Sequence, residues 1–183
     1  MTDTYTVLSA ITAVLAFLIL YVWSSYNRLI RLRFQVKTDY SDIDIQLKRR
    51  LSLIDNLVGM VKAYAKHEKE TFTQVAQARS AIESTKGVED KAQASDALSR
   101  TLKSLFMVVE AYPELKSSEN YKTLRDDLLG TENLIAGYRE DYNRSVQEYN
   151  TAIQMFPALL VASLFGFREE EFFTSAEAEN STK

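Results

Sequence analysis

The most constraining feature of this sequence is an uncharged run near the amino terminus. Residues 4–27 include no Asp, Glu, Lys or Arg over 24 positions. As a helix this run is about 36 Å long, enough to cross a hydrocarbon layer of about 30 Å. A core helix of a soluble protein is rarely apolar on every side over such a length. We therefore predict a transmembrane helix, with aromatic rings near its two ends at Tyr5, Tyr21 and Trp23, where headgroups favour them.

A cleaved signal peptide is the alternative interpretation of this run. The segment before it offers Asp3 but no basic residue, and no clear small-x-small cleavage site follows, so the pattern favours an uncleaved anchor. All 22 Lys and Arg residues lie at position 28 or later, beginning with Arg28, Arg31 and Arg33. The positive-inside rule then predicts an amino terminus outside the membrane and the bulk of the chain in the cytoplasm.

The rest of the chain is poor in residues that break helices. Five glycines and two prolines in 183 residues are about a third of ordinary usage, which predicts a few long helices. From Leu29 to Ile82 the apolar positions recur about every 3.5 residues, as in helices packed lengthwise. We predict one helix to about Thr85, continuous with the membrane span, with Gly59 as its weakest point.

Two further helices follow, from about Asp90 to Ala111 and from about Glu119 to Met155. The second of these has a strict heptad seam of apolar or small side chains: Tyr121, Leu124, Leu128, Thr131, Ile135, Tyr138, Tyr142, Ser145, Tyr149, Ala152 and Phe156. After Pro157 we predict a short apolar helix that Gly166 caps. The expected fold is all-α. It consists of a single transmembrane helix in residues 1–27, an antiparallel coiled-coil-like bundle in residues 28–173 and a disordered tail in residues 174–183.

Composition excludes most catalytic chemistry. The chain has no cysteine and one histidine, His67, and its net charge of -3 gives no basic footprint for nucleic acid. His67 and Glu68 begin like a zinc-protease motif, but Thr71 stands where the second histidine belongs. The glycines are too far apart for a phosphate-binding loop. We therefore predict no catalytic activity, no metal and no cofactor.

Two polar groups are candidates for interaction. Lys48, Arg49 and Arg50 form the one basic run, which fits a solvated helix face paired with Asp44 or a contact with another protein. The second group lies on the heptad helix and comprises Glu132, Tyr138, Arg139, Tyr142, Asn143, Tyr149 and Asn150. It fits a buried network between helices or a groove for a partner or small molecule.

Several segments in fixed order resemble the LemA family. They are YNRLIRLRFQV, IDIQLKRRLSLIDNLVGMVKAYAKHEKETF, AYPELKSSENYKTL, TENLIAGYREDYNRSVQEYNTAIQMFP and ASLFGFREEEFF, within residues 26–173. The resemblance implies a bundle of long antiparallel helices at a bacterial inner membrane, with the amino terminus outside. It implies no particular activity, because the family has no agreed biochemical function.

The lengths of the predicted helices suggest a role. The first soluble helix, about 85 Å long, exceeds the second, about 33 Å long, so part of its apolar seam would lack cover within the chain. Another subunit would supply that cover, which predicts a self-assembling scaffold and a homo-oligomer. The alternative is an adaptor or sensor that recruits another envelope protein, such as a membrane protease.

Overall fold

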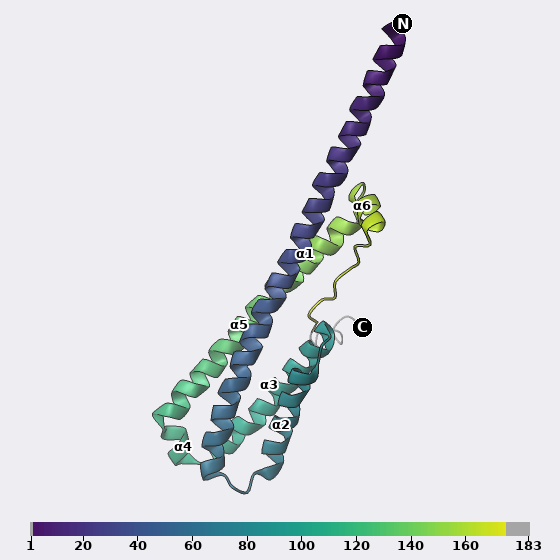
Figure 1. Cartoon of the computed structure of the whole chain (residues 1–183). Coiled ribbons are helices and arrows are strands. Elements are labelled where there is room, and N and C mark those ends of the chain that lie inside the picture. Colours follow the sequence, from purple (N-terminus) through teal and green to yellow (C-terminus); the bar gives the residue numbers. More distant parts are fainter. Residues whose placement is uncertain (1, 175–183) are drawn as a thin grey trace, which may run out of the picture. The chain divides into compact units, whose positions relative to one another are not determined.

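The computed structural model describes residues 2–174, and every regular element in this part of the chain is an α-helix (Figure 1). Nine of the ten residues of the predicted disordered tail, 175–183, lie outside the described residues. The helices are α1 (Thr2–Tyr64), α2 (Lys69–Ser84), α3 (Val88–Glu110), α4 (Pro113–Ser117), α5 (Glu119–Gln154) and α6 (Ala158–Phe165). This confirms the predicted all-helical class.

Helix α1 runs unbroken for 63 residues, which confirms that the apolar segment and the first bundle helix are continuous. The prediction that it extends to Thr85 was wrong. It ends at Tyr64, and the chain reverses through residues 65–68 into α2, not at Gly59. Five consecutive polar residues, 66–70, lie at this reversal, whereas one exposed glycine within a helix costs only about 1 kcal/mol. The reversal buries Val75 and Ile82 in the bundle core.

The chain divides into two compact units. Unit 2 comprises residues 39–143 and the described residues from Glu171 onward. Within it, α1 is antiparallel to α5, and α2 is antiparallel to α3 (Figure 1). The core is a continuous apolar cluster with contributions from α1 to α5: Leu51, Ile54, Leu57, Val61, Ala65, Val75, Ile82, Leu98, Leu102, Leu105, Val109, Leu115, Tyr121, Leu124 and Leu128.

The heptad seam predicted for α5 is buried along almost its whole length. Tyr121, Leu128, Thr131, Ile135, Tyr142 and Tyr149 are all less than 5% exposed. Tyr138 is half-buried, and Phe156, beyond the helix end, is exposed. In α3 the buried stripe comprises Ala92, Ser95, Leu98, Leu102, Leu105 and Val109.

The apolar seam of α1 has cover within the chain. Its core positions are almost fully buried: Leu29, Val36, Ile43, Leu47, Leu51, Ile54, Val61 and Ala65. The expectation that part of this stripe stays uncovered was therefore wrong, because the reversal into α2 shortens the helix and the 36-residue α5 is longer than α3. The physical reason given for a second subunit no longer holds.

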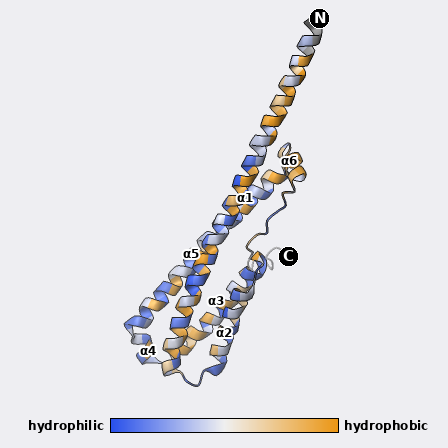
Figure 2. Ribbon diagram, in the orientation of Figure 1, coloured by the Kyte–Doolittle hydropathy of each residue, from blue (hydrophilic) through white to orange (hydrophobic). Residues whose placement is uncertain are grey.

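Unit 1 comprises the described residues up to Thr38 and residues 144–170. The α1 residues from Leu8 to Leu20 are exposed on all sides and strongly hydrophobic (Figure 2). Among the described helices, α1 is the one that is long and apolar enough to cross a membrane. The same unit contains α6, which Gly166 terminates in a left-handed conformation at φ 71°, as predicted for this glycine.

Candidate functional site

A polar pocket of about 280 Å³ opens in unit 2 between α1, α3 and α5. We call it the arginine pocket. Four cationic and two acidic side chains line it together with small and apolar ones: Arg50, Ser95, Asp96, Ser99, Arg100, Lys103, Glu132, Ile135, Ala136 and Arg139. The charged groups in the lining therefore sum to about +2, four cations less two carboxylates, which favours an anionic occupant.

Arg50 is the innermost of these charges, with 2% of its surface exposed. Its Nη2 donates to Ser99 Oγ at 3.0 Å and lies 3.3 Å from Glu132 Oε2. Burial lowers the pKa of the Arg50 guanidinium, while the charge of Glu132 opposes that shift and the charge of Arg139 adds to it. Arg50 is buried because it follows the buried Ile43 by seven residues, and residues seven apart lie on the same side of a helix.

The basic run is thus divided between two faces of α1. Lys48 and Arg49 are exposed, and Lys48 pairs with Asp44 at 2.7 Å, one turn earlier. The predicted solvated helix face therefore comprises Lys48 and Arg49, whereas Arg50 lies on the buried face. Asp44 also accepts from Lys91 of α3 at 2.7 Å. Burial raises the pKa of Asp44, but hydrogen bonds from the two lysines outweigh it and hold that pKa below its ordinary value.

Arg139 is the second arginine of the pocket. Its Nη1 donates to Asp96 Oδ1 at 2.9 Å, and its guanidinium carbon lies 4.8 Å from the centre of the Phe173 ring. Three buried donors in the pocket have no hydrogen-bond partner within the described residues: Arg50 Nε, Arg139 Nε and Ser95 Oγ. Buried donors in native proteins normally have a partner, either within the protein or in an ordered water molecule.

A second polar arrangement joins α5 to the extended segment 167–173, which we call the strap. In unit 2, the Tyr142 hydroxyl donates to the Glu171 carbonyl at 2.8 Å. Asn143 donates to the Phe173 carbonyl at 3.2 Å and accepts from the Phe173 amide at 2.8 Å. One asparagine side chain therefore satisfies both backbone groups of one strap residue.

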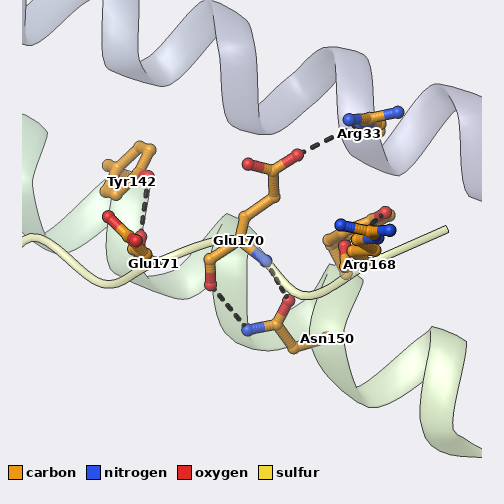
Figure 3. A network of polar contacts seen from close by, with 7 residues as sticks. Arg33, Tyr142, Asn150, Arg168, Glu170 and Glu171 are labelled. Carbon is orange, nitrogen blue, oxygen red and sulfur yellow. Dashed lines mark hydrogen bonds and ion pairs between the residues drawn. The ribbon is translucent and has the colours of Figure 1, made fainter. Parts of the chain in front are cut away.

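Unit 1 contains the same arrangement one heptad later on α5, and Figure 3 shows Asn150 facing the backbone of Glu170. The Tyr149 hydroxyl donates to the Arg168 carbonyl at 3.0 Å, and burial raises the pKa of this hydroxyl. Asn150 donates to the Glu170 carbonyl at 2.9 Å and accepts from the Glu170 amide at 2.9 Å. The Glu170 carboxylate in turn pairs with Arg33 of α1 at 3.1 Å.

The partners of the two Tyr-Asn pairs have a regular spacing in the sequence. The pairs stand seven residues apart on α5, and their asparagine partners, Glu170 and Phe173, stand three residues apart. The tyrosine partners, Arg168 and Glu171, have the same spacing. Each pair therefore binds backbone atoms of the strap within its own unit.

The other predicted residues have less definite surroundings. Tyr138 is half-buried. At the end of the apolar run, Tyr21 is half-buried and Trp23 is exposed, as are Arg28 and Arg31; Tyr5, near its start, is exposed as well. The sequence predictions missed the α3 side of the pocket, from Ser95 to Lys103. A signal existed, because Ser95 and Ser99 are polar residues on or beside the buried stripe of a helix.

A family model described as the LemA family matches residues 39–183. Magnetosome protein MamQ of Magnetospirillum gryphiswaldense is 26% identical over 174 residues, covering 81% of this chain and 64% of that protein. Magnetosome protein MamQ 2 of Paramagnetospirillum magneticum is 26% identical over 179 residues, covering 84% of this chain and 66% of that protein. The chain thus spans slightly less than two thirds of each of these curated relatives.

Proposed function

Since the chain belongs to the LemA family, we propose that it is a non-enzymatic adaptor anchored in a bacterial inner membrane. Helix α1 is the anchor, with the amino terminus outside and the bundle in the cytoplasm. The exposed apolar residues from Leu8 to Leu20 support the anchor, and the exposed Arg28 and Arg31 after them support the orientation. The names of the relatives place those proteins at the magnetosome, and we carry over nothing more specific.

The arginine pocket is the observation that carries the adaptor role. It holds a net positive charge and three buried donors without partners among the described residues. A buried donor left without a partner costs about 1 to 3 kcal/mol. A carboxylate side chain of a partner protein can accept from several donors at once, and it also balances the charge. We therefore propose that the bundle recruits a partner through an acidic segment.

A self-assembling scaffold is the second candidate, and its basis is weaker. The homo-oligomer predicted from the sequence depended on an uncovered seam of α1, and that seam is buried within the chain. The homo-oligomer stays a prediction, to be decided by measurement of mass. An adaptor needs only one copy of the pocket and does not require self-contacts.

Chemical crosslinking in cells, followed by affinity purification and mass spectrometry, tests the adaptor. The variant Arg100→Gln/Lys103→Gln removes two exposed cations of the pocket and leaves the Arg50–Glu132 and Arg139–Asp96 ion pairs in place. Lys122→Gln/Arg125→Gln is the matched control, with the same charge change and spacing on an exposed face of α5. We expect another envelope protein to co-purify with the wild-type chain and with the control variant, but not with the pocket variant. Self-contacts alone would favour the scaffold, and equal recovery from both variants would reject the pocket.

A binding measurement on purified protein tests the chemistry of the pocket separately. Glutarate supplies carboxylates without any partner protein. At ten times its dissociation constant it should stabilise the full chain by about 1.4 kcal/mol, or about 3 to 6 °C in Tm. The pocket variant should lose this shift, and the matched control should keep it. A shift of the same size in both variants would show that glutarate acts elsewhere.

A further inference from the structure

Unit 1 has an apolar surface that no described residue of the chain covers. It lies on α6 and on the two residues after α5, and we call it the α6 surface. Its side chains are between 46% and 78% exposed: Met155, Phe156, Leu159, Leu160, Leu164 and Phe165. On the inner side of the same helix, Val161 and Ala162 are buried. Helix α6 therefore packs through one face and leaves a larger apolar face open, which marks a contact site in a protein.

The α6 surface is continuous with the end of the apolar run of α1. The Phe165 ring lies 4.8 Å from the Tyr26 ring, centre to centre, and Phe167 lies 5.7 Å from the same ring. Phe165 also lines an apolar groove of about 450 Å³ with Leu18, Ile19, Val22, Trp23 and Tyr26. The groove thus joins α6 to the last two turns of the apolar run, in one compact unit.

Length and charge determine how α6 can meet a bilayer. Eight residues make about 12 Å of helix, too short to cross a hydrocarbon layer of about 30 Å. The sequence ALLVASLF carries no charge, so nothing in the helix opposes insertion at the boundary. On α1 the exposed Arg28 and Arg31 follow Tyr26 within about one turn and a half. An aromatic ring followed by arginines is the arrangement that proteins place at the headgroup level.

We propose that the α6 surface lies in the lipid boundary on the cytoplasmic side, as a second membrane contact beside the α1 anchor. The proposal rests on the proposed function in one respect, that α1 crosses the membrane. Lipid is the occupant because the α6 surface continues an apolar surface that itself requires lipid. Helices held at this level place their apolar face about 5 to 10 Å into the boundary between headgroups and acyl chains.

Tryptophan fluorescence of the full chain in phosphatidylcholine vesicles tests the proposal. Trp23→Phe removes the single native tryptophan, and a new tryptophan then replaces Leu164, Leu15 or Met107, one at a time. All three positions are at least half exposed, so the new side chain displaces no core atom. Acyl chains brominated near the headgroup quench a tryptophan at the lipid boundary, and chains brominated near the terminal methyl group quench one at the centre of the bilayer, where position 15 of the anchor would lie. We expect blue-shifted, quenched emission for Leu164→Trp and water-like, unquenched emission for Met107→Trp.

The Leu15→Trp variant separates the two proposals. Quenching at position 15 without quenching at 164 would refute the α6 contact and keep the anchor. Absence of quenching at position 15 by chains brominated near the terminal methyl group would refute the anchor, and the α6 proposal with it. Blue-shifted emission at 164 without quenching would mean that protein, such as a second copy, covers the α6 surface, and would also overturn the proposal. Leu160→Trp repeats the measurement on the same face in case Leu164→Trp lowers the helical content.

Discussion

Replacement of Asn150 by alanine should release part of the strap without unfolding the bundle. In the folded chain the Asn150 amide satisfies both the carbonyl and the amide of Glu170, each at 2.9 Å. Alanine can do neither, and the Glu170 backbone then depends on water. Asn150 is 8% exposed, so water reaches this position poorly until the strap opens.

The size of the effect follows from the two hydrogen bonds. Each contributes about 0.5 to 1.5 kcal/mol net, so the free energy of opening the strap locally should fall by about 1 to 3 kcal/mol. Local opening of that size raises amide exchange about 5- to 140-fold. Hydrogen exchange of the full chain in detergent, read by mass spectrometry on peptides from residues 167–174, measures it. Peptides from α3 should exchange at the wild-type rate, because the opening is local.

Asn133→Ala is the control for this experiment. Asn133 lies on the exposed side of α5, and its replacement brings the same gain in helix propensity without touching the strap. Asn150→Asp adds a second comparison. Its carboxylate can still accept from the Glu170 amide but places an oxygen against the Glu170 carbonyl. Exchange in Asn150→Ala equal to that in Asn133→Ala would refute the role given to this side chain.

Three further predictions concern the bundle. Asp44→Asn should lower the free energy of unfolding at neutral pH, because hydrogen bonds from Lys48 and Lys91 hold the pKa of Asp44 down in the folded state alone. The difference from wild type should vanish as the pH falls below about 4, where the wild-type carboxylate is protonated. Urea unfolding between pH 7 and pH 2.5 measures this difference, and a difference that stays constant with pH would contradict the prediction. Glu132→Gln should cost about 1 to 3 kcal/mol, because Arg50 loses its charged partner. Arg50→Met added to Glu132→Gln should recover stability in the same unfolding assay, and a further loss would show that the guanidinium has other essential contacts. Light scattering of the full chain in mild detergent, with the detergent mass subtracted, decides the predicted homo-oligomer, and a single monomeric species would reject it.

Periodicity predicted the long helices well, because burial along a straight helix repeats at a fixed interval. The seam of α5 follows the heptad positions over more than 30 residues, from Tyr121 to Ala152. The left-handed glycine at 166 was predictable too, because a short apolar helix ends there and only glycine adopts that conformation at low cost.

The reversal after Tyr64 was not predictable from periodicity. The apolar spacing continues through residues 65–72 nearly unchanged, so the pattern fits one long helix as well as two. The choice depends on what each helix packs against. Folding back lets Val75 and Ile82 join the core that α1 and α3 share, which a straight helix would place beyond that core. A long polar run proved a better marker of the turn than an isolated glycine.

The candidate site was predictable only on one side. Arg139 and Glu132 stand on the helix with the clearest pattern, and their neighbourhood was identified. Arg50 could not be separated from Lys48 and Arg49 by composition, because only the register of α1 buries one and exposes the other two. The targets of the Tyr-Asn pairs were hidden for a different reason, since they are backbone atoms and leave no mark on the sequence.

Recognition of the strap through its backbone has a consequence for how this segment can change. Within residues 168–173 the strap groups held by the two Tyr-Asn pairs are carbonyls and amides, which every amino acid except proline provides. Many side chains there are therefore exchangeable without loss of these bonds. An insertion or deletion of one residue is different, because it shifts one pair of partners relative to the other. The length of this segment is thus under tighter physical control than its composition.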